Sequence, residues 1–464
     1  MTAKSSLKTP RPETRMTREE RRATGKALRD QASLKSHANW KPDSRRQDPV
    51  DILVKSSRGR VRTLLPIRYG RMMASPFAFY RGAAAIMAAD LGPTPVSGIR
   101  VQACGDCHLM NFGGFATPER RIIFDINDFD ETLPAPWEWD VKRLAASFLI
   151  AARNNKFSEK EARECAQACV RAYREQMARL SEMSALERWY ARLDLETMMG
   201  MLPNKEAKRF LQKRVQKAAS RSIADDDFPA LASSKGGKHV INDNPPLIFH
   251  PAESQHPAYQ RLASKAFRDY RATLADDRRL LLDHYELKDL ALKVVGVGSV
   301  GTRCGILLLM AGDDDPLFLQ FKEARMSVLE PYAGRSIYSN RGERIVAGLR
   351  LMQSASDIFL GWSEGGKGIH YYFRQLRDMK LKPLVETFDE RIMKTYAGFC
   401  GWTLARAHAK SGYPSMISGY LGNSERFDEA VADFGVTYAN QNEKDYRALL
   451  KAIRAGKIEA HQEP

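Results

Sequence analysis

The sequence predicts a mixed α+β chain with two lobes, one mainly helical and the other rich in β-strands. Its 464 residues, 43% of them hydrophobic, can supply more than one packed core. Apolar residues recur at helical spacing over 139–195 and again after Phe388. Between these parts, short apolar runs separated by glycine and Asp-Pro turns fill 292–321, which indicates strands. Because the two patterns occupy different parts of the chain, we expect helices and sheet to be segregated.

Changes in composition divide the chain into four regions. The first, 1–50, is basic and polar and is expected to be a loosely ordered arm. One helix is predicted in it, from Thr17 to about Leu34, because Thr17 can cap the helix and Glu20 stands three positions later. The remaining regions are a helical catalytic-loop lobe over 51–285, a β-rich nucleotide-binding lobe over 286–385, and C-terminal helices over 386–464 that pack on the helical lobe.

The other elements follow from the spacing of apolar residues and from the turn residues between them. In the N-terminal half these signals predict a buried alanine-rich helix over 77–91, a strand over 98–103, a hairpin of 111–115 and 121–127, and amphipathic helices over 139–154 and 158–195. In the C-terminal half they predict a loop or flap over 225–257, a helix over 256–287, strands within 292–321, a helix over 342–356, strands over 358–361 and 369–376, and helices from Phe388 onward.

Charge and cysteine content restrict the class of protein. The 73 basic and 56 acidic residues give a net charge of +17. This surplus suits an anionic partner such as a nucleotide, a phosphorylated substrate, nucleic acid or acidic lipid, with nucleic acid not favoured. Six cysteines are too few for a disulfide framework in a chain of this length. With no secretion signal and no apolar run long enough for a transmembrane segment, a cytoplasmic protein is expected.

The run 105–111, GDCHLMN, carries the first chemical motif. Asp106 precedes Asn111 by five residues, and an apolar strand then ends in the acids of 125–131. The Asp can accept a hydroxyl proton, the Asn can hold Mg²⁺, and a later acid can hold the metal against nucleotide phosphates. Asp125, Asp128 and Asp130 are the candidates for that acid. His108 is expected to shape the same loop, so the motif predicts an ATP- and Mg²⁺-dependent phosphotransferase.

A glycine-rich run, GVGSVG over 296–301, supplies the second motif. A strand is expected on each side of it, whereas a dinucleotide-binding fingerprint would need a helix directly after the last glycine. Lys322 ends the next strand and can reach the nucleotide phosphates. Its acidic helix partner is expected to be Glu343, with Glu330 and Glu323 as alternatives. The residues predicted to cover the phosphates are Gly296, Gly298, Ser299 and Gly301.

Two resemblances follow from these residues. The motif of Asp106 and Asn111, followed by Asp128 and then by Asp140 before an alanine-rich helix, resembles the aminoglycoside and choline phosphotransferase branch of the protein-kinase-like superfamily. The separation of Asp128 and Asp140 matches that branch, which is why Asp128 is preferred over Asp125. From 79–82 through 357–362 to 401–409, the chain is also similar to the bacterial family called domain of unknown function 2252, a name that implies no activity.

The order of the motifs differs from that of ordinary kinases, in which the glycine loop and lysine precede the catalytic loop. One interpretation is a circularly permuted, protein-kinase-like two-lobed fold with extra helices. The Leu-Ala-Arg-Ala-His-Ala segment of 404–409 supports it, because a similar helix directly precedes the catalytic loop in small-molecule kinases. The other interpretation is that one motif is coincidental. Permutation predicts that Lys322 lies near Asp128 or Asp125.

The predicted function is phosphoryl transfer from ATP to a hydroxyl of an unknown small molecule or protein. Nucleotidyl transfer remains open, because the same groups can bind a nucleotide in another pose. The alternative is a non-catalytic basic binding or scaffold protein, with a nucleic-acid or protein partner, on a degenerate kinase-like fold. The basic arm and the net charge of +17 motivate this alternative.

Overall fold

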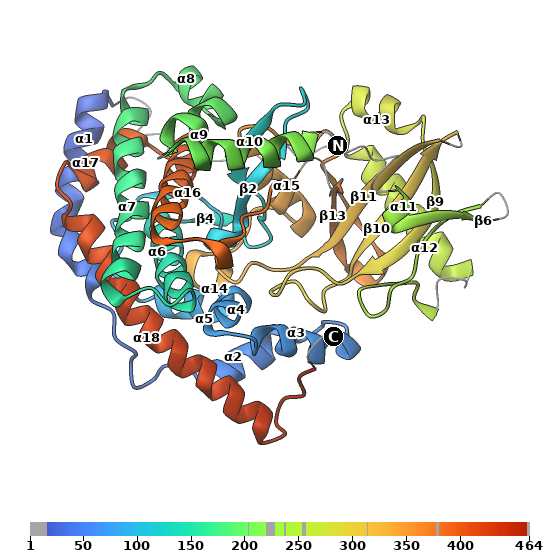
Figure 1. The fold of residues 1–464 in the computed structure, drawn as a ribbon, viewed down its shortest axis with the longest axis horizontal. Coiled ribbons are helices and arrows are strands. Elements are labelled where there is room, and N and C mark those ends of the chain that lie inside the picture. The colour runs from blue at the N-terminus through green and yellow to red at the C-terminus, as the bar shows by residue number, and fades with distance from the viewer. Residues whose placement is uncertain are drawn as a thin grey trace.

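The computed structural model of the chain has helices on one side and a six-stranded antiparallel sheet on the other (Figure 1). It describes residues 16–202, 204–219, 228–235, 238–252, 257–312, 314–376 and 380–461. Helices contain 55% of the residues and strands 16%, which confirms the predicted α+β class. None of the helices in these ranges is long and apolar enough to cross a membrane.

The N-terminal segment is packed from residue 16 onward. Helix α1 (Arg18–Ala27) starts with the predicted capping box of Thr17 and Glu20. It lies against α17 (Pro414–Leu421), where a Cβ on Gly25 would collide with the carbonyl of Met416. Leu34 and Trp40, farther along this segment, are buried as well. The expected loosely ordered arm is therefore wrong for residues 16–50, because apolar and small side chains along it are packed. The rest of the predicted arm, 1–15, lies outside the described residues.

Short helices lead from this segment to the first strand. The predicted helix over 77–91 is two helices, which are separated at Ala83. Arg46 forms ion pairs with Asp90 and Asp445, at 2.7 and 2.6 Å, so this region is also tied to the C-terminal helix. The helices are α2 (Pro49–Ser56), α3 (Leu65–Met72), α4 (Pro76–Gly82) and α5 (Ala84–Leu91).

Long helices form the main core. The most extensive contact is between α7 and α16, where a Cβ on Gly401 would collide with the carbonyl of Cys169. The predicted helix over 158–195 ends at Glu182, because Ser184 and Glu187 form a second capping box and start a new helix. The helices of this part are α6 (Trp137–Asn154), α7 (Glu159–Glu182), α8 (Ala185–Tyr190), α9 (Leu195–Met201), α10 (Lys205–Ala219), α16 (Glu390–Ser411) and α18 (Arg426–Arg454).

Two small sheets lie beside α16. Strand β1 (Arg100–Ala103) pairs with β4 (Leu133–Pro136), and the predicted hairpin is confirmed as β2 (Phe112–Ala116) and β3 (Ile122–Ile126). Strand β5 (Leu193–Asp194) extends this hairpin. Both motif-bearing segments, the loop after β1 and the acids after β3, therefore leave short strands close to the same helix.

The six-stranded sheet has the order β12-β13-β11-β10-β9-β8. Its strands are β8 (Ile248–Phe249), β9 (Glu286–Lys293), β10 (Cys304–Ala311), β11 (Asp315–Ala324), β12 (Gly361–Glu364) and β13 (His370–Gln375). The predicted strand over 358–361 is wrong, because Asp357 accepts the backbone N–H of Phe359 and forms a turn there. Helices α12 (Pro257–Ala272), α13 (Asp276–Leu282) and α15 (Arg341–Met352) accompany the sheet; the last confirms the helix predicted over 342–356 but ends at Met352. The short helix α14 (Glu330–Ala333) lies against β4 instead.

The segment predicted as a loop over 225–257 contains regular structure. Its described parts include α11 (Phe228–Leu231) and a hairpin of β6 (Ala232–Lys235) and β7 (Lys238–Ile241). The backbone N–H of Ile241 donates to Asp289 of β9 at 2.7 Å, so the hairpin is joined to the main sheet. The prediction of a loop is therefore wrong for these described parts, although the segment is rich in turn residues.

Candidate active site

The loop that carries Asp106 is held by a carboxylate of α6. Asp140 accepts the backbone N–H groups of Cys104 and Gly105, at 2.6 and 2.9 Å. Nε2 of His408, on α16, lies 3.2 Å from the same carboxylate, which is 1% exposed. Gly105 has a φ of +86°, a conformation that favours glycine. Two helices and one glycine thus set the course of the backbone directly before Asp106.

The side chain of Asp106 is oriented by Arg143. The guanidinium donates to Oδ1 of Asp106 through Nε at 2.8 Å and also through Nη2. The Asp106 side chain is 22% exposed, whereas Arg143 is 2% exposed and lies over the ring of Tyr80. Burial raises the pKa of Asp106, and the positive charge of Arg143 opposes that shift. One carboxylate oxygen is therefore fixed, and the side chain still reaches the surface.

His108 and Asn111 complete the loop. Nε2 of His108 lies 3.9 Å from Oδ2 of Asp106, and burial, together with Arg81 and Arg143, lowers the pKa of His108 well below its ordinary value. The imidazole is therefore neutral near pH 7. Nδ2 of Asn111 donates to the carbonyl of Asp106 at 2.6 Å. The side-chain oxygen of Asn111 is then the atom that could serve as a ligand for a cation.

A lysine from the six-stranded sheet meets the acids that follow β3. Nζ of Lys322 lies 3.3 Å from Oδ2 of Asp128 and 2.6 Å from Oδ2 of Asp130. The hydroxyl of Tyr372 donates to the other oxygen of Asp130 at 2.7 Å. The Lys322 side chain is 3% exposed, whereas those of Asp128 and Asp130 are 33% and 27% exposed. The ammonium group is thus at the bottom of the cluster, and the acids face outward.

The pKa values of the two acids shift in opposite directions. Burial raises the pKa of Asp130, but Lys322 and the Tyr372 hydroxyl bring it down to about 2. Burial and the nearby Asp130 raise the pKa of Asp128, and Lys322 opposes this shift. The same acids raise the pKa of Lys322 well above its ordinary value, although burial opposes this. Asp130 is thus the close ionic partner of Lys322, and Asp128 is the more exposed carboxylate that a further cation could join.

The glycine loop lies next to these acids. It connects β9 and β10, so a strand follows it as predicted, and Oγ of Ser299 donates to Oδ2 of Asp130 at 3.1 Å. Gly296 and Gly301 have positive φ angles of 64° and 84°. Arg60 binds the carbonyls of residues 298 and 300 at 2.7 and 2.6 Å, and Arg71 binds that of residue 296. Arginines of the N-terminal segment therefore hold the loop at three carbonyls.

Two of the predicted site residues lie elsewhere. Asp125 is fully buried and binds Arg406 and Ser354, so it is not the metal-binding acid. Glu343 is not the acidic partner of Lys322, because Asp128 and Asp130 occupy that position. The alternatives Glu323 and Glu330 are also used elsewhere: they bind Arg303 and the backbone of Ser327.

Several residues that contact the site were missed by sequence reasoning. Arg143 is three positions after Asp140 on α6, a spacing that puts both on one face of a helix. Tyr372 and Arg374 are two positions apart on β13 and share a face; Arg374 donates to the carbonyl of Asn127 at 3.0 Å. These spacings were visible in the sequence. The sequence did not show which residues these side chains would contact.

The capacity for a metal rests on few protein ligands. Within the described parts of the chain, no group of three or more His, Cys, Asp and Glu residues could hold a metal ion. Mg²⁺ in phosphotransferases usually takes one or two carboxylates, substrate phosphates and water. The outward-facing carboxylate of Asp128 and the side-chain oxygen of Asn111 fit such a partial ligand set.

Comparison with known proteins identifies a family for the chain. Residues 60–452 match a family described as "Uncharacterized protein conserved in bacteria (DUF2252)". No curated protein and no solved structure gives a match. The match spans the Asp106 loop, the glycine loop, Lys322 and most of α18, which is well over half of the sequence. The chain therefore belongs to the DUF2252 family of bacterial proteins.

Proposed function

We propose that the chain is an ATP- and Mg²⁺-dependent phosphotransferase with a kinase-like, circularly permuted arrangement of motifs. The supporting observation is the contact of Lys322 with Asp128 and Asp130, to which Ser299 of the glycine loop also belongs. In kinases a lysine, a glycine-rich loop and a metal-binding Asp share the nucleotide phosphates. Here the equivalent groups converge from segments about 170–190 positions apart.

Each group has a role in this proposal. Lys322 and the glycine loop bind the ATP phosphates, and Asp128 and Asn111 hold Mg²⁺. When bound, Mg²⁺ neutralises charge on the phosphates. Asp106 accepts the proton of the acceptor hydroxyl through Oδ2, while Arg143 keeps Oδ1 in place. The raised pKa of Asp106 favours this role, since a general base works best near the operating pH.

Arg81 supplies a further cation. It follows Tyr80, whose carbonyl accepts from Arg143 at 3.3 Å, and its own carbonyl lies 3.4 Å from the position of a Cβ on Gly298. Arg81 is thus between the glycine loop and the Asp106 loop. Its Nε is buried and has no hydrogen-bond partner within the described residues. We assign this guanidinium to the transferred phosphoryl group, whose charge it would stabilise.

Thermal shift with ATP and Mg²⁺ tests the proposal. A ligand that binds the native state stabilises it by about 2.7 kcal/mol at 100 times its Kd. The wild type should therefore melt at a higher temperature with Mg-ATP, and Lys322→Ala and Asp128→Asn should lose most of this increase. Asp433→Asn is the matched control: its Asp-Phe-Gly triplet spells a kinase metal motif but lies within α18, where Asp433 pairs with Arg163. No increase with any nucleotide would refute the proposal.

One observation favours a second function, nucleotide-independent binding. Asp106 is paired with Arg143, and Asp130 is paired closely with Lys322, so these two carboxylates have cationic partners without a ligand. A scaffold protein would need no charged ligand in addition to these ion pairs.

If Mg-ATP binds, ATP labelled at the γ- or the α-phosphate distinguishes phosphoryl from nucleotidyl transfer to protein or small molecules.

A further inference from the structure

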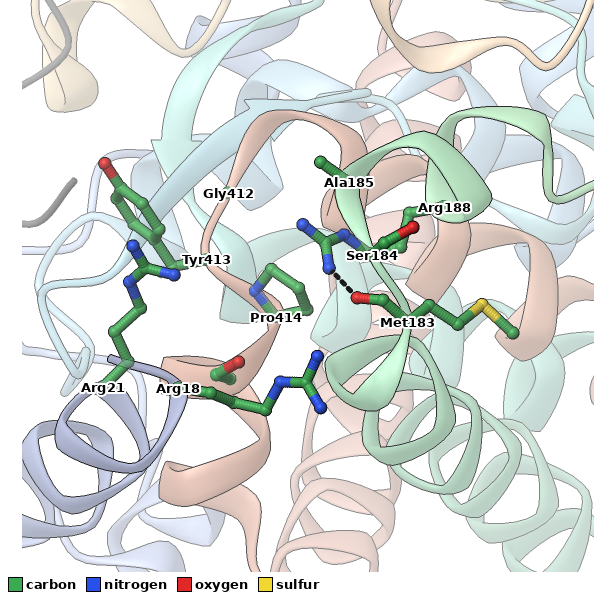
Figure 2. Close-up of a pocket in the computed structure, with 10 residues that line it drawn as sticks. Arg18, Arg21, Met183, Ser184, Ala185, Arg188, Gly412, Tyr413 and Pro414 are labelled. Carbon is green, nitrogen blue, oxygen red and sulfur yellow. Dashed lines mark hydrogen bonds between the residues drawn. The ribbon is translucent and has the colours of Figure 1, made fainter. Parts of the chain in front are cut away.

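A second polar pocket lies away from the candidate active site (Figure 2). It has a volume of about 470 Å³ and is formed where α1, the start of α8 and the link between α16 and α17 meet. Capping of α8 by Ser184 and the turn at Gly412 shape two of its walls. None of its lining residues belongs to the Asp106, Asp128 or Lys322 cluster.

Positive charge dominates this pocket. Arg18, Arg21 and Arg188 line it, and no acidic residue does. Glu182, outside the lining, pairs with Arg18 at 2.9 Å but is shared with Arg22. The guanidinium of Arg188 donates to the carbonyl of Met183 (Figure 2), and in the described parts of the chain no carboxylate lies within ion-pair distance of it. Burial lowers the pKa of Arg188, and the nearby Arg18 and Arg21 lower it further, although Glu187 opposes the shift.

The start of α17 adds to the same field. This helix begins at Pro414, in the wall of the pocket, and its N-cap residue Tyr413 makes no side-chain capping hydrogen bond. The N-terminal end of a helix carries partial positive charge and N–H groups that need acceptors. An anion between Arg18 and Arg188 would therefore meet guanidinium groups and a helix N-terminus together.

We infer that this pocket is a phosphate-binding site, distinct from the active site, for inorganic phosphate or the phosphate group of a small metabolite. Arginine guanidinium groups match phosphate oxygens with paired, charge-assisted hydrogen bonds. The pocket volume suits a small molecule. The site also touches the catalytic-loop strand, because a Cβ on Gly412 would lie 2.7 Å from Val101 of β1.

Calorimetric titration of the full chain with inorganic phosphate, at constant ionic strength, tests this inference. Arg188→Gln and Arg18→Gln should each weaken binding by about tenfold or more, because each removes charge-assisted hydrogen bonds. Arg447→Gln is the control, since this exposed arginine of α18 has only a weak contact with Glu443 at 3.8 Å. Circular dichroism of each variant confirms that it is folded.

The Lys322→Ala variant separates the two sites. Phosphate binding that survives Lys322→Ala but is lost in Arg188→Gln supports the pocket, whether or not the chain is a phosphotransferase. Tighter binding of glycerol 3-phosphate than of phosphate would favour a metabolite as the source. The inference is overturned if Arg188→Gln binds phosphate as tightly as the wild type, or if Arg447→Gln loses as much phosphate affinity as Arg188→Gln. It is also overturned if titrations with RNA or a phosphopeptide show that Arg188→Gln weakens only their binding and not that of phosphate.

Discussion

Nζ of Lys322 lies 2.6 Å from Oδ2 of Asp130, although 192 positions separate the two residues. This contact joins β11 of the six-stranded sheet to the segment after β3. The same ammonium reaches Asp128, so one buried cation serves two acids. The proposed roles of Lys322 in phosphate binding and of Asp128 in Mg²⁺ binding both depend on this contact between distant segments.

Lys322→Ala should lower the free energy of unfolding at pH 7 by about 1–3 kcal/mol, because two partly buried carboxylates lose their cation. The pKa of Asp130 is about 2, below its unfolded value near 3.9. Its stabilising effect is therefore present above about pH 4 and is lost as the pH falls towards 2. Urea unfolding should show the difference between variant and wild type narrowing from pH 6 to pH 3. Lys265→Ala, which removes an exposed ion pair, should change little at any pH.

Glu131→Gln should stabilise the protein at pH 8. Burial raises the pKa of Glu131 to about 7, and the N–H of Val328 opposes the shift. Because an acid with a raised pKa binds its proton more tightly in the folded state, stability falls as the pH rises from about 4.5 to 7. Glutamine keeps the acceptor for Val328 and removes this loss, which is up to about 3 kcal/mol. Denaturation at pH 5 and pH 8 measures it; a variant less stable than the wild type at pH 8 would contradict the prediction.

Asp106→Asn should abolish phosphoryl transfer and also destabilise the fold by about 2 kcal/mol, because Arg143 loses its carboxylate while 2% exposed. Because asparagine has nearly the same shape as aspartate, shape alone would predict no change in stability. Mg-ATP binding should persist, since Asp106 is not assigned to the metal. The double variant Asp106→Asn/Arg143→Met should recover stability in urea but not turnover. Recovery of turnover would show that Asp106 is not the base.

Asp140→Asn should weaken the fold by about 1–3 kcal/mol, because an amide offers one acceptor where the carboxylate now accepts two backbone N–H groups. Turnover should fall as well, since those groups fix the loop before Asp106. Asp194→Asn is the control: Asp194 caps α9 by accepting from Thr197, and asparagine caps equally well. Equal losses of stability in both variants would count against a special role for Asp140.

Arg81→Ala should reduce kcat by about 100-fold with a smaller change in the KM for ATP, as expected for a group that acts mainly on the transferred phosphoryl charge. Arg81→Lys should recover part of the rate, since it restores the charge without the fork geometry. Arg454→Ala, at the exposed end of α18, serves as the control. A change confined to KM would instead assign Arg81 to nucleotide binding.

Predictions that depended on neighbouring residues were the most successful. The capping box at Thr17, the hairpin after Asn111 and the strand after the glycine loop all follow from local preferences. The failures concern partners. Asp125 and Glu343 had suitable chemistry, but Asp125 points into the core towards Arg406, and Glu343 lies apart from Lys322. Residues 16–50 seemed too polar to pack, yet small residues such as Gly25 allow close helix contacts.

By itself the sequence determined the α+β class, most of the helices and strands, and the chemical types of the two motifs, because these depend on residues within a few positions of each other. Only the tertiary structure decided that Asp130 is the close partner of Lys322 and that Arg143 holds Asp106. The physical reason is that ion pairs form between whichever groups the packing of distant elements brings together. In this chain, the packing of the six-stranded sheet against the segment after β3 makes that choice.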